Sequence, residues 1–334
     1  MMKKRVREGS ALFLALLLVC SIITLQRVDA ANAVDTTARC SVEFTLAGGT
    51  YEELNSIDIP VRLYRVASID ESGKYTALAG FESVDVSSLE SDTASADAWL
   101  ARAAAAADLI TDATPAAAST TIKNGKGSLP DTIDTGLYLV VAESVNSDNY
   151  TYSFTPYLIS LPNNYYASTG NDDWIYDLTG ENALSLKPEQ TQRLGSLVIN
   201  KNLIEHHVTM GENATFVFQI DITTPDGKTT TELKTMTFDG STDSKSVTVG
   251  DIPAGSTVTV TEIYSGAGYT LTADSQGPQS VTIIADESAE VTFTNEHDGT
   301  ITGGIGVDNH YTLDENGQYD VEQLENSASS VQVQ

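Results

Sequence analysis

Residues 195–296 are dominated by short stretches in which apolar and polar residues alternate with a period of two. This period is typical of β-strands that bury one face. Turn signals such as Pro225-Asp226-Gly227 separate the stretches. About seven short strands in roughly 100 residues predict a β-sandwich. The predicted strands are Leu197–Lys201, Thr215–Ile222, Thr231–Phe238, Ser246–Val249, Thr257–Tyr264, Ser280–Ile284 and Glu290–Asn295.

Residues 40–190 also favour strands, with one exception. The stretch Ser95–Ile110 holds five consecutive alanines, a composition of high helix propensity, and either Ser95 or Asp97 is suited to cap it. Pro188–Leu194 is polar, and we place the domain boundary there. The predicted strands are Ser41–Leu46, Ile59–Val66, Gly136–Glu143, Ser153–Leu161 with Pro156 at a bulge or an edge, Trp174–Leu178 and Ala183–Lys187.

These patterns predict an all-β protein with two Ig-like β-sandwich domains in tandem, residues 40–190 with the inserted Ala-rich helix and residues 195–296. Residues 1–33 are typical of a secretory signal peptide, because a basic start precedes an apolar run that is too short for a membrane span of about 20 residues. Ordinary cleavage near Ala33 is favoured over lipidation at Cys20. Residues 297–334 form an acidic tail in which a small hairpin followed by disorder is expected.

Cleavage near Ala33 leaves 13 basic and 44 acidic residues. Such an acidic chain is not suited to bind nucleic acid or an anionic membrane, and no membrane span is expected in the mature chain. Only Cys40 remains, so no intrachain disulfide is expected. No metal or cofactor motif is present; His206 and His207 are adjacent and point to opposite faces of any strand.

Three strands end their apolar faces with a polar residue, namely Lys201, Glu262 and Asn295. A lysine on a buried face is costly unless it is neutral, paired or chemically used. A neutral Lys201 amine can attack the Asn295 carboxamide carbon, while a protonated Glu262 polarises the carboxamide oxygen and shuttles protons. Ammonia would leave and a Lys–Asn isopeptide bond would remain. The alternatives are a buried ion pair with Asn295 hydrogen-bonded nearby, or strand ends in solvent.

Residues 195–296 resemble the Cna protein B-type repeat domains of Gram-positive surface adhesins and the matching domains of pilin shafts. The resemblance rests on Gly195–Lys201, Ile252–Glu262, Gly268-Tyr269 and Val291–Asn295. It implies that Lys201 and Asn295 form an isopeptide bond and that Glu262 assists.

Residues 40–190 look like the N-terminal domain of major pilin subunits, on the motifs Ile59–Val66, the Ala-rich helix, Gly136–Val140, Phe154–Leu158 and Trp174–Asp177. Such domains carry a lysine that a sortase joins to the next subunit, usually just after a proline. Lys187 instead precedes Pro188, so it is either this acceptor or an ordinary solvated lysine. The first strand, Ser41–Leu46, offers no lysine, so no isopeptide bond is expected in this domain, although Glu143 occupies the place of a helper acid.

The resemblance implies a structural subunit of a cell-surface pilus or fimbria that joins other pilin subunits through a sortase. It implies no turnover enzyme, since the self-crosslink forms once. The alternative is a monomeric secreted or surface adhesin that binds a host protein or glycan. Residues 297–334 contain no LPxTG-like sorting motif, so the mode of anchoring is left open.

Overall fold

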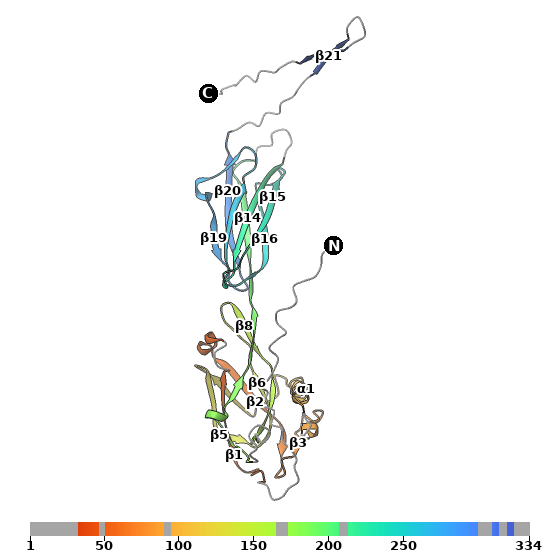
Figure 1. Ribbon diagram of the computed structural model, residues 1–334, viewed down its shortest axis with the longest axis vertical. Coiled ribbons are helices and arrows are strands. Elements are labelled where there is room, and N and C mark those ends of the chain that lie inside the picture. Colours follow the sequence, from red (N-terminus) through yellow and green to blue (C-terminus); the bar gives the residue numbers. More distant parts are fainter. Residues whose placement is uncertain are drawn as a thin grey trace. The chain divides into compact units, whose positions relative to one another are not determined.

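The computed structural model describes residues 33–46, 51–89, 95–164, 173–206, 213–299, 309–313 and 319–323, with only the backbone of Asp131 and of the last two segments. The predicted signal peptide lies almost wholly outside the described residues. The chain divides into two compact units, with the division between Arg193 and Leu194. Figure 1 shows the strands that make up most of both units.

A central sheet of unit 1 has the strand order β3-β2-β6-β9, and β4 adds to β2. Both faces of this sheet are buried. In β6, Tyr138 and Val140 enter the core on one face, whereas Leu137 and Leu139 enter the core on the other. This explains why the stretch after Gly136 is apolar throughout instead of alternating. The strands are β2 (Ile59–Ile69), β3 (Tyr75–Ala77), β4 (Ala118–Ile122), β6 (Gly136–Ala142) and β9 (Tyr157–Leu161).

Two smaller sheets supply the rest of the core on the first face of the central sheet. In one of them, β1 pairs in parallel with β10 and β11 and antiparallel with β5. In the other, β8 lies between β12 and β7. These strands are β1 (Arg39–Leu46), β5 (Lys126–Asp134), β7 (Val145–Asn146), β8 (Tyr150–Phe154), β10 (Asp177–Leu178), β11 (Leu184–Leu186) and β12 (Pro188–Gln192), and the 3-10 turns η1 (Glu52–Ser56) and η3 (Gly180–Asn182) connect strands of this unit.

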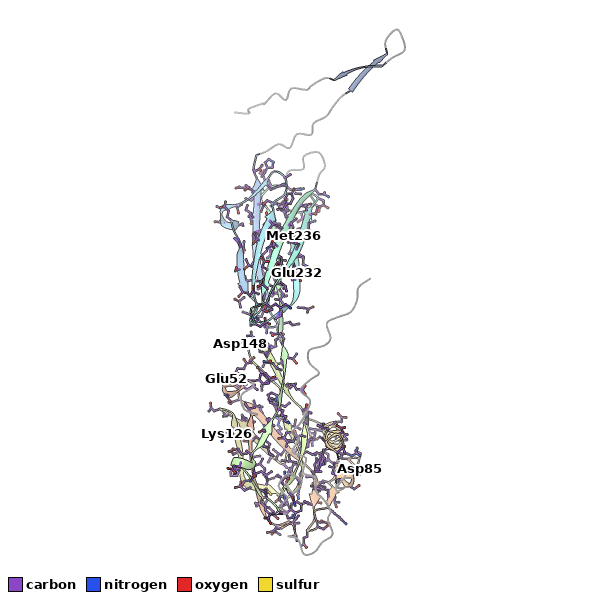
Figure 2. The ribbon with its side chains drawn as sticks, viewed as in Figure 1. Glu52, Asp85, Lys126, Asp148, Glu232 and Met236 are labelled. Atoms are coloured by element: carbon purple, nitrogen blue, oxygen red, sulfur yellow. The ribbon has the colours of Figure 1, made fainter. Side chains whose placement is uncertain are left out.

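The helix α1 (Ala96–Ala107) and the 3-10 turn η2 (Val86–Leu89) contribute to the core on the second face. Trp99 is among the helix residues buried there. Ser95 caps α1, because its Oγ accepts a hydrogen bond from the Ala98 amide (3.2 Å). Asp85, labelled in Figure 2, contacts Arg102 of the helix at 3.1 Å. The predicted Ala-rich helix is therefore confirmed, with Ser95 as its cap.

Two segments of unit 1 differ from the sequence prediction. The predicted strand Ser153–Leu161 is interrupted at Thr155-Pro156, and its halves β8 and β9 join different sheets. Proline has no backbone N–H to donate to a ladder, which favours an interruption at this point. The polar stretch at the domain boundary, in which no strand was predicted, contains β12, which pairs antiparallel with β8. Its side chains are mostly exposed, so hydrophobic alternation could not reveal it.

Unit 2 is a β-sandwich of two four-stranded sheets, β16-β13-β20-β18 and β15-β14-β17-β19, and their inner faces share one apolar core. Together with the sheets of unit 1, this confirms the predicted all-β fold class. The first strand, β13, pairs in parallel with the last, β20. The strands are β13 (Leu194–Leu203), β14 (Ala214–Thr223), β15 (Thr229–Phe238), β16 (Ser244–Pro253), β17 (Thr257–Tyr264), β18 (Tyr269–Leu271), β19 (Gln279–Thr282) and β20 (Ser288–His297), with the 3-10 turn η4 (Ala273–Ser275).

Beyond the sandwich, β21 (Asn309–Leu313) and β22 (Tyr319–Gln323) pair antiparallel as a hairpin. Within the described part of the chain, no helix has the length and apolar character needed to cross a bilayer.

Candidate functional site

The three polar residues singled out in the sequence come together inside the sandwich of unit 2. Lys201 is 0% exposed, although it carries a cation on the strand face that also buries Leu197 and Ile199. Asn295 on β20 is likewise 0% exposed, and the Glu262 side chain on β17 is fully buried beside Lys201. The alternative in which these residues are strand ends in solvent is therefore wrong.

The backbone pairing explains how three distant residues meet. Because β13 and β20 run in parallel, Lys201 lies opposite Phe293, and Asn295 lies two residues further along, opposite Leu203. Glu262 comes from the facing sheet, where it pairs with Phe218 of β14. The site thus joins the first and last strands of one sheet to a middle strand of the other.

The side chains form a closed set of contacts. The Lys201 Nζ atom donates a hydrogen bond to Asn295 Oδ1 and lies 3.4 Å from Glu262 Oε2. Asn295 Nδ2 donates to Glu262 Oε1 at 2.7 Å. Nζ also lies 3.4 Å from the carbonyl oxygen of Asn202. Each of the three side chains therefore touches both of the others.

Burial makes the lysine unusually acidic. Loss of solvent lowers the pKa of Lys201 from 10.5 to about 8, although the negative charge of Glu262 opposes this shift. The ring of Phe216 also lies 4.4 Å from Nζ, a position that favours the cation. Neutral and charged amine are therefore closer in free energy here than for a lysine in water.

One carboxylate oxygen is left open. Glu262 Oε2 is buried and has no hydrogen-bond partner among the described residues. The Lys201 amine lies beside it at ion-pair distance, 3.4 Å. Oε2 is thus placed to accept a proton from Nζ, which would leave a neutral amine against a carboxamide.

The geometry differs from the sequence-based mechanism in one respect. The hypothesis places Glu262 at the carboxamide oxygen, whereas in the structure its Oε1 contacts the carboxamide nitrogen. The nitrogen is the group that leaves when an amine displaces it. Lys201, not Glu262, contacts the carboxamide oxygen.

Phe216 is the neighbour that sequence reasoning missed. It belongs to the buried face of β14, with Phe218 two residues later, and its ring also contacts those of Phe238 and Tyr269 edge-on. The alternation in β14 does place it on the core face. Which core residue lies over the lysine depends on how the two sheets face each other, and the sequence does not give that.

In unit 1 the first strand, β1, also pairs in parallel with later strands, β10 and β11, but without the same side chains. The inner face of β1 is formed by Cys40, Val42 and Phe44, which are all buried. Glu143, the acid considered as a helper there, is half-exposed and pairs with Arg62 at 2.6 Å. Lys187 is exposed between β11 and β12, in unit 1 and not in the unit that holds the buried triad.

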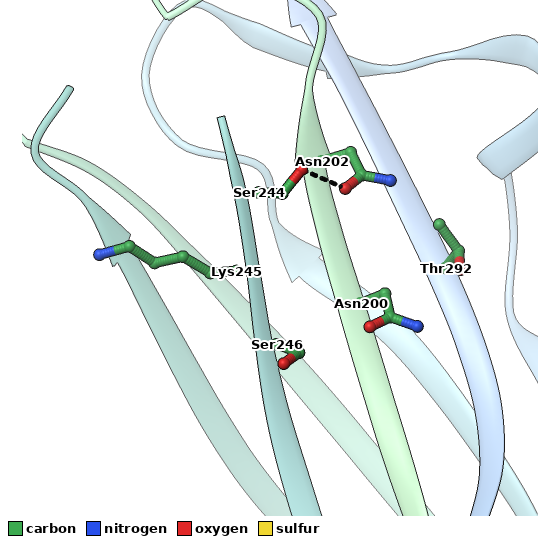
Figure 3. Close-up of a pocket in the computed structure, with 6 residues that line it drawn as sticks. All are labelled: Asn200, Asn202, Ser244, Lys245, Ser246 and Thr292. Atoms are coloured by element: carbon green, nitrogen blue, oxygen red, sulfur yellow. Dashed lines mark hydrogen bonds between the residues drawn. The ribbon is translucent and has the colours of Figure 1, made fainter. Parts of the chain in front are cut away.

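A second polar feature lies on the outer face of the sheet that carries Lys201. Asn200, Asn202, Ser244, Ser246 and Thr292 line a shallow depression, in which Ser244 donates to Asn202 (2.8 Å; Figure 3). This depression is separate from the buried site, since Asn200 and Asn202 are on the opposite face of β13 from Lys201.

Among the described residues, no group of His, Cys, Asp and Glu is arranged to hold a metal ion. His207 lies outside the described residues.

A family model described as a domain of unknown function (DUF5979) matches residues 197–298, which include all three buried polar residues. No curated protein matches the chain.

Among solved structures, the chain is similar to GBS52, the minor pilin of Streptococcus agalactiae, at 13% identity over 80% of this chain and 100% of that chain, with a TM-score of 0.25. It is similar to the shaft pilin SpaA of Lactobacillus rhamnosus GG at 13% identity over 79% of this chain and 100% of that chain (TM-score 0.25). It is also similar to the TIE protein of Bacillus anthracis at 12% identity over 85% of this chain and 41% of that chain (TM-score 0.33).

Pilins of Gram-positive bacteria are thus among the structures that this chain is similar to, as the sequence resemblance predicts. The assignment of the fold stands on the strand pairing described above.

Proposed function

We propose that unit 2 closes itself with an isopeptide bond between Lys201 and Asn295, and that the protein serves as a structural subunit of a bacterial surface pilus. The observation that carries the first part is the contact of the Lys201 amine with the Asn295 carboxamide at a site where both residues are 0% exposed. The second part rests on the sequence resemblance and on the position of the bond in the chain.

The reaction begins with a proton transfer. The ion pair of Lys201 and Glu262 becomes a neutral amine and a neutral acid when one proton moves from Nζ to Oε2. The dry surroundings favour this exchange, because they penalise both charges. The neutral amine is a nucleophile, and the carboxamide carbon of Asn295 is the electrophile next to it.

Bond exchange then follows on Asn295. The Nζ–Cγ bond forms, the Cγ–Nδ2 bond breaks, and Nδ2 leaves as ammonia. Of the three protons that Nζ held at the start, one stays on the new amide, one leaves with ammonia and one remains on Glu262. Glu262 is suited to deliver the proton to the leaving nitrogen because its Oε1 already contacts Nδ2.

The position of the bond suits a protein that bears tension. It would join residues 94 positions apart, on the first and last strands of the unit. A pull on the two ends of the unit would then pass from β13 to β20 through a covalent link, and the hydrogen bonds of the sandwich would carry little load. An amide also resists reduction, which suits a predicted mature chain with one cysteine.

Assembly into a pilus would require an attachment point on the neighbouring subunit. Lys187 is exposed, and the resemblance assigns it the role of the amine that a sortase joins to another pilin subunit. We therefore propose sortase-joined subunits on the cell surface, with Lys187 as the acceptor.

The test of assembly compares cells that produce the wild-type chain with cells that produce Lys187→Arg. A ladder of covalent multimers that resists boiling in detergent is expected for the wild type and should disappear for the variant. Lys123→Arg, which changes another exposed lysine of unit 1, is the matched control and should keep the ladder. Absence of any ladder, together with binding of a host protein or glycan, would favour the monomeric adhesin instead.

A further inference from the structure

The strand that carries Asn295 is paired unequally on its two sides. On one side β13 follows β20 from Ser288 to Asn295. On the other side β18 reaches only Asn295, Glu296 and His297. The residues just before Asn295 have no strand partner on that side among those described. The segment Thr272–Gln279 takes this place; it contains η4 and ends at the first residue of β19, and we call it the clamp segment.

The clamp segment first holds the residue next to Asn295. The Thr294 amide donates to the Oγ of Ser275 at 2.9 Å, and Ser275 is only 5% exposed. The Thr294 carbonyl accepts from the Thr272 amide at 3.0 Å and from the Thr272 hydroxyl at 3.2 Å. The backbone N–H and C=O of Thr294 are therefore both hydrogen-bonded, as they would be to a neighbouring strand. Here the partners are the Ser275 side chain and the backbone and side chain of Thr272.

Gln279 holds the same strand two residues earlier. Its side-chain amide donates to the Thr292 carbonyl at 2.6 Å, and its side-chain carbonyl accepts from the Thr292 amide at 3.2 Å. One glutamine side chain thus imitates the edge of a neighbouring strand. Both bonds fix β20 in position along its own axis.

The backbone of Gln279 belongs to the facing sheet. It pairs with Val260 in β17, the strand that carries Glu262 two residues further on. Gln279 therefore links the strand of Glu262 through its backbone and the strand of Asn295 through its side chain. It is a direct bridge between the two sheets at a point close to the reacting groups.

We propose that Gln279 is a positioning residue for the isopeptide reaction, because it sets the register of Asn295 against Glu262 before the bond forms. The inference rests on the proposed self-crosslinking. Gln279 touches none of the reacting atoms, so it acts only through the placement of β20. Loss of the bridge frees the strand to shift, and shifts of roughly 1 Å at a reacting centre cost on the order of 100-fold in rate.

The experiment follows bond formation in the full chain as it folds. The chain is made by cell-free translation in a short labelled pulse, and samples are quenched in acid at intervals. Mass spectrometry of the digested samples then gives the fraction in which the Lys201 and Asn295 peptides are joined with loss of one ammonia. For Gln279→Ala we expect a rate ~10- to 100-fold below that of the wild type, with the same final extent. Gln279→Glu keeps the acceptor for Thr292 but loses the donor, and it should fall between the two.

Two controls separate positioning from folding. Gln276→Ala changes the same residue type in the clamp segment at an exposed place outside the bridge, and it should react at the wild-type rate. Gln279→Ala is also placed in a Glu262→Ala background, which is expected not to crosslink, and its melting temperature there reports the structural cost. The rates are measured well below that temperature.

The outcomes are distinct. A wild-type rate for Gln279→Ala overturns the positioning role and leaves the crosslink intact. A slow rate that is matched by loss of folded protein in the Glu262→Ala background overturns it too, because the effect is then only structural. A wild-type chain that never loses ammonia overturns both the positioning role and the proposed crosslink.

Discussion

Removal of the crosslink should cost unit 2 a free energy that follows from the spacing of its two anchors. Lys201 and Asn295 are 94 residues apart, so the bond closes a loop that spans nearly the whole sandwich. In the chain-entropy account, a crosslink across about 100 residues stabilises the folded state by about 4.7 kcal/mol. For a domain of roughly this size, each kcal/mol corresponds to about 4–8 °C, which predicts a fall in melting temperature of roughly 20–40 °C.

The perturbation is Glu262→Gln, which keeps the shape of the side chain and removes its ability to carry protons. This variant also leaves the buried Lys201 without its counter-charge, a further source of instability. The double variant Lys201→Met, Glu262→Gln removes both the bond and the unpaired charge. Its melting temperature relative to the wild type, measured by calorimetry, isolates the effect of loop closure.

Two results would refute this reasoning. If the double variant melts within about 5 °C of a crosslinked wild type, the bond does not restrain the unfolded chain as the loop estimate requires. If Glu262→Gln still loses ammonia at the wild-type rate, the proton-carrying role of Glu262 is wrong. Unit 1 supplies an internal control, since its unfolding should be unchanged in every variant of unit 2.

Two other predictions follow from the local structure. The variant Asn295→Ala cannot crosslink, so its Lys201 stays a free amine. The pKa of Lys201 is about 8 in the folded chain and 10.5 in the unfolded chain. Between these two pH values the folded chain has released a proton that the unfolded chain still holds. Stability in urea should therefore rise between pH 8 and 10.5, by about 3 kcal/mol, and a flat profile would contradict the depressed pKa. Ser95→Ala removes the N-cap of α1 and should lower the stability of unit 1 by about 1 kcal/mol in calorimetry. A loss as small as that of Ser87→Ala, whose hydroxyl donates to the exposed Asp85, would show that the cap contributes little.

The sequence pattern was sufficient to predict which residues of the site are buried, because the alternation of side chains along a strand is a local property. Alternation along one strand places Lys201 among buried residues without any knowledge of its neighbours. The same holds for Glu262 and Asn295. The three residues meet because β13 pairs in parallel with β20 and because the sheet that carries Glu262 packs against the sheet that carries the other two. The alternation pattern does not specify either arrangement. The prediction that the three residues meet came from the family resemblance.

Other features depend on contacts that leave no periodic signal. Gln279 sits on a strand of four residues, and its role comes from a side chain that binds the backbone of another sheet. Polar β12 is likewise held by pairing and not by an apolar face. β18 has only three residues, too few to show a period of two. In contrast, the interruption at Pro156 and the cap at Ser95 have local chemical causes, so the sequence could indicate both.

Peptide mapping of the mature wild-type chain tests the central claim most directly. The proposal predicts one branched peptide in which Lys201 is joined to Asn295, with the mass of the two peptides less one ammonia. Localisation is essential, since a succinimide at Asn124-Gly125 would lose the same mass from the intact chain. Recovery of unlinked peptides that contain Lys201 and Asn295, each at full mass, from folded protein would contradict the account.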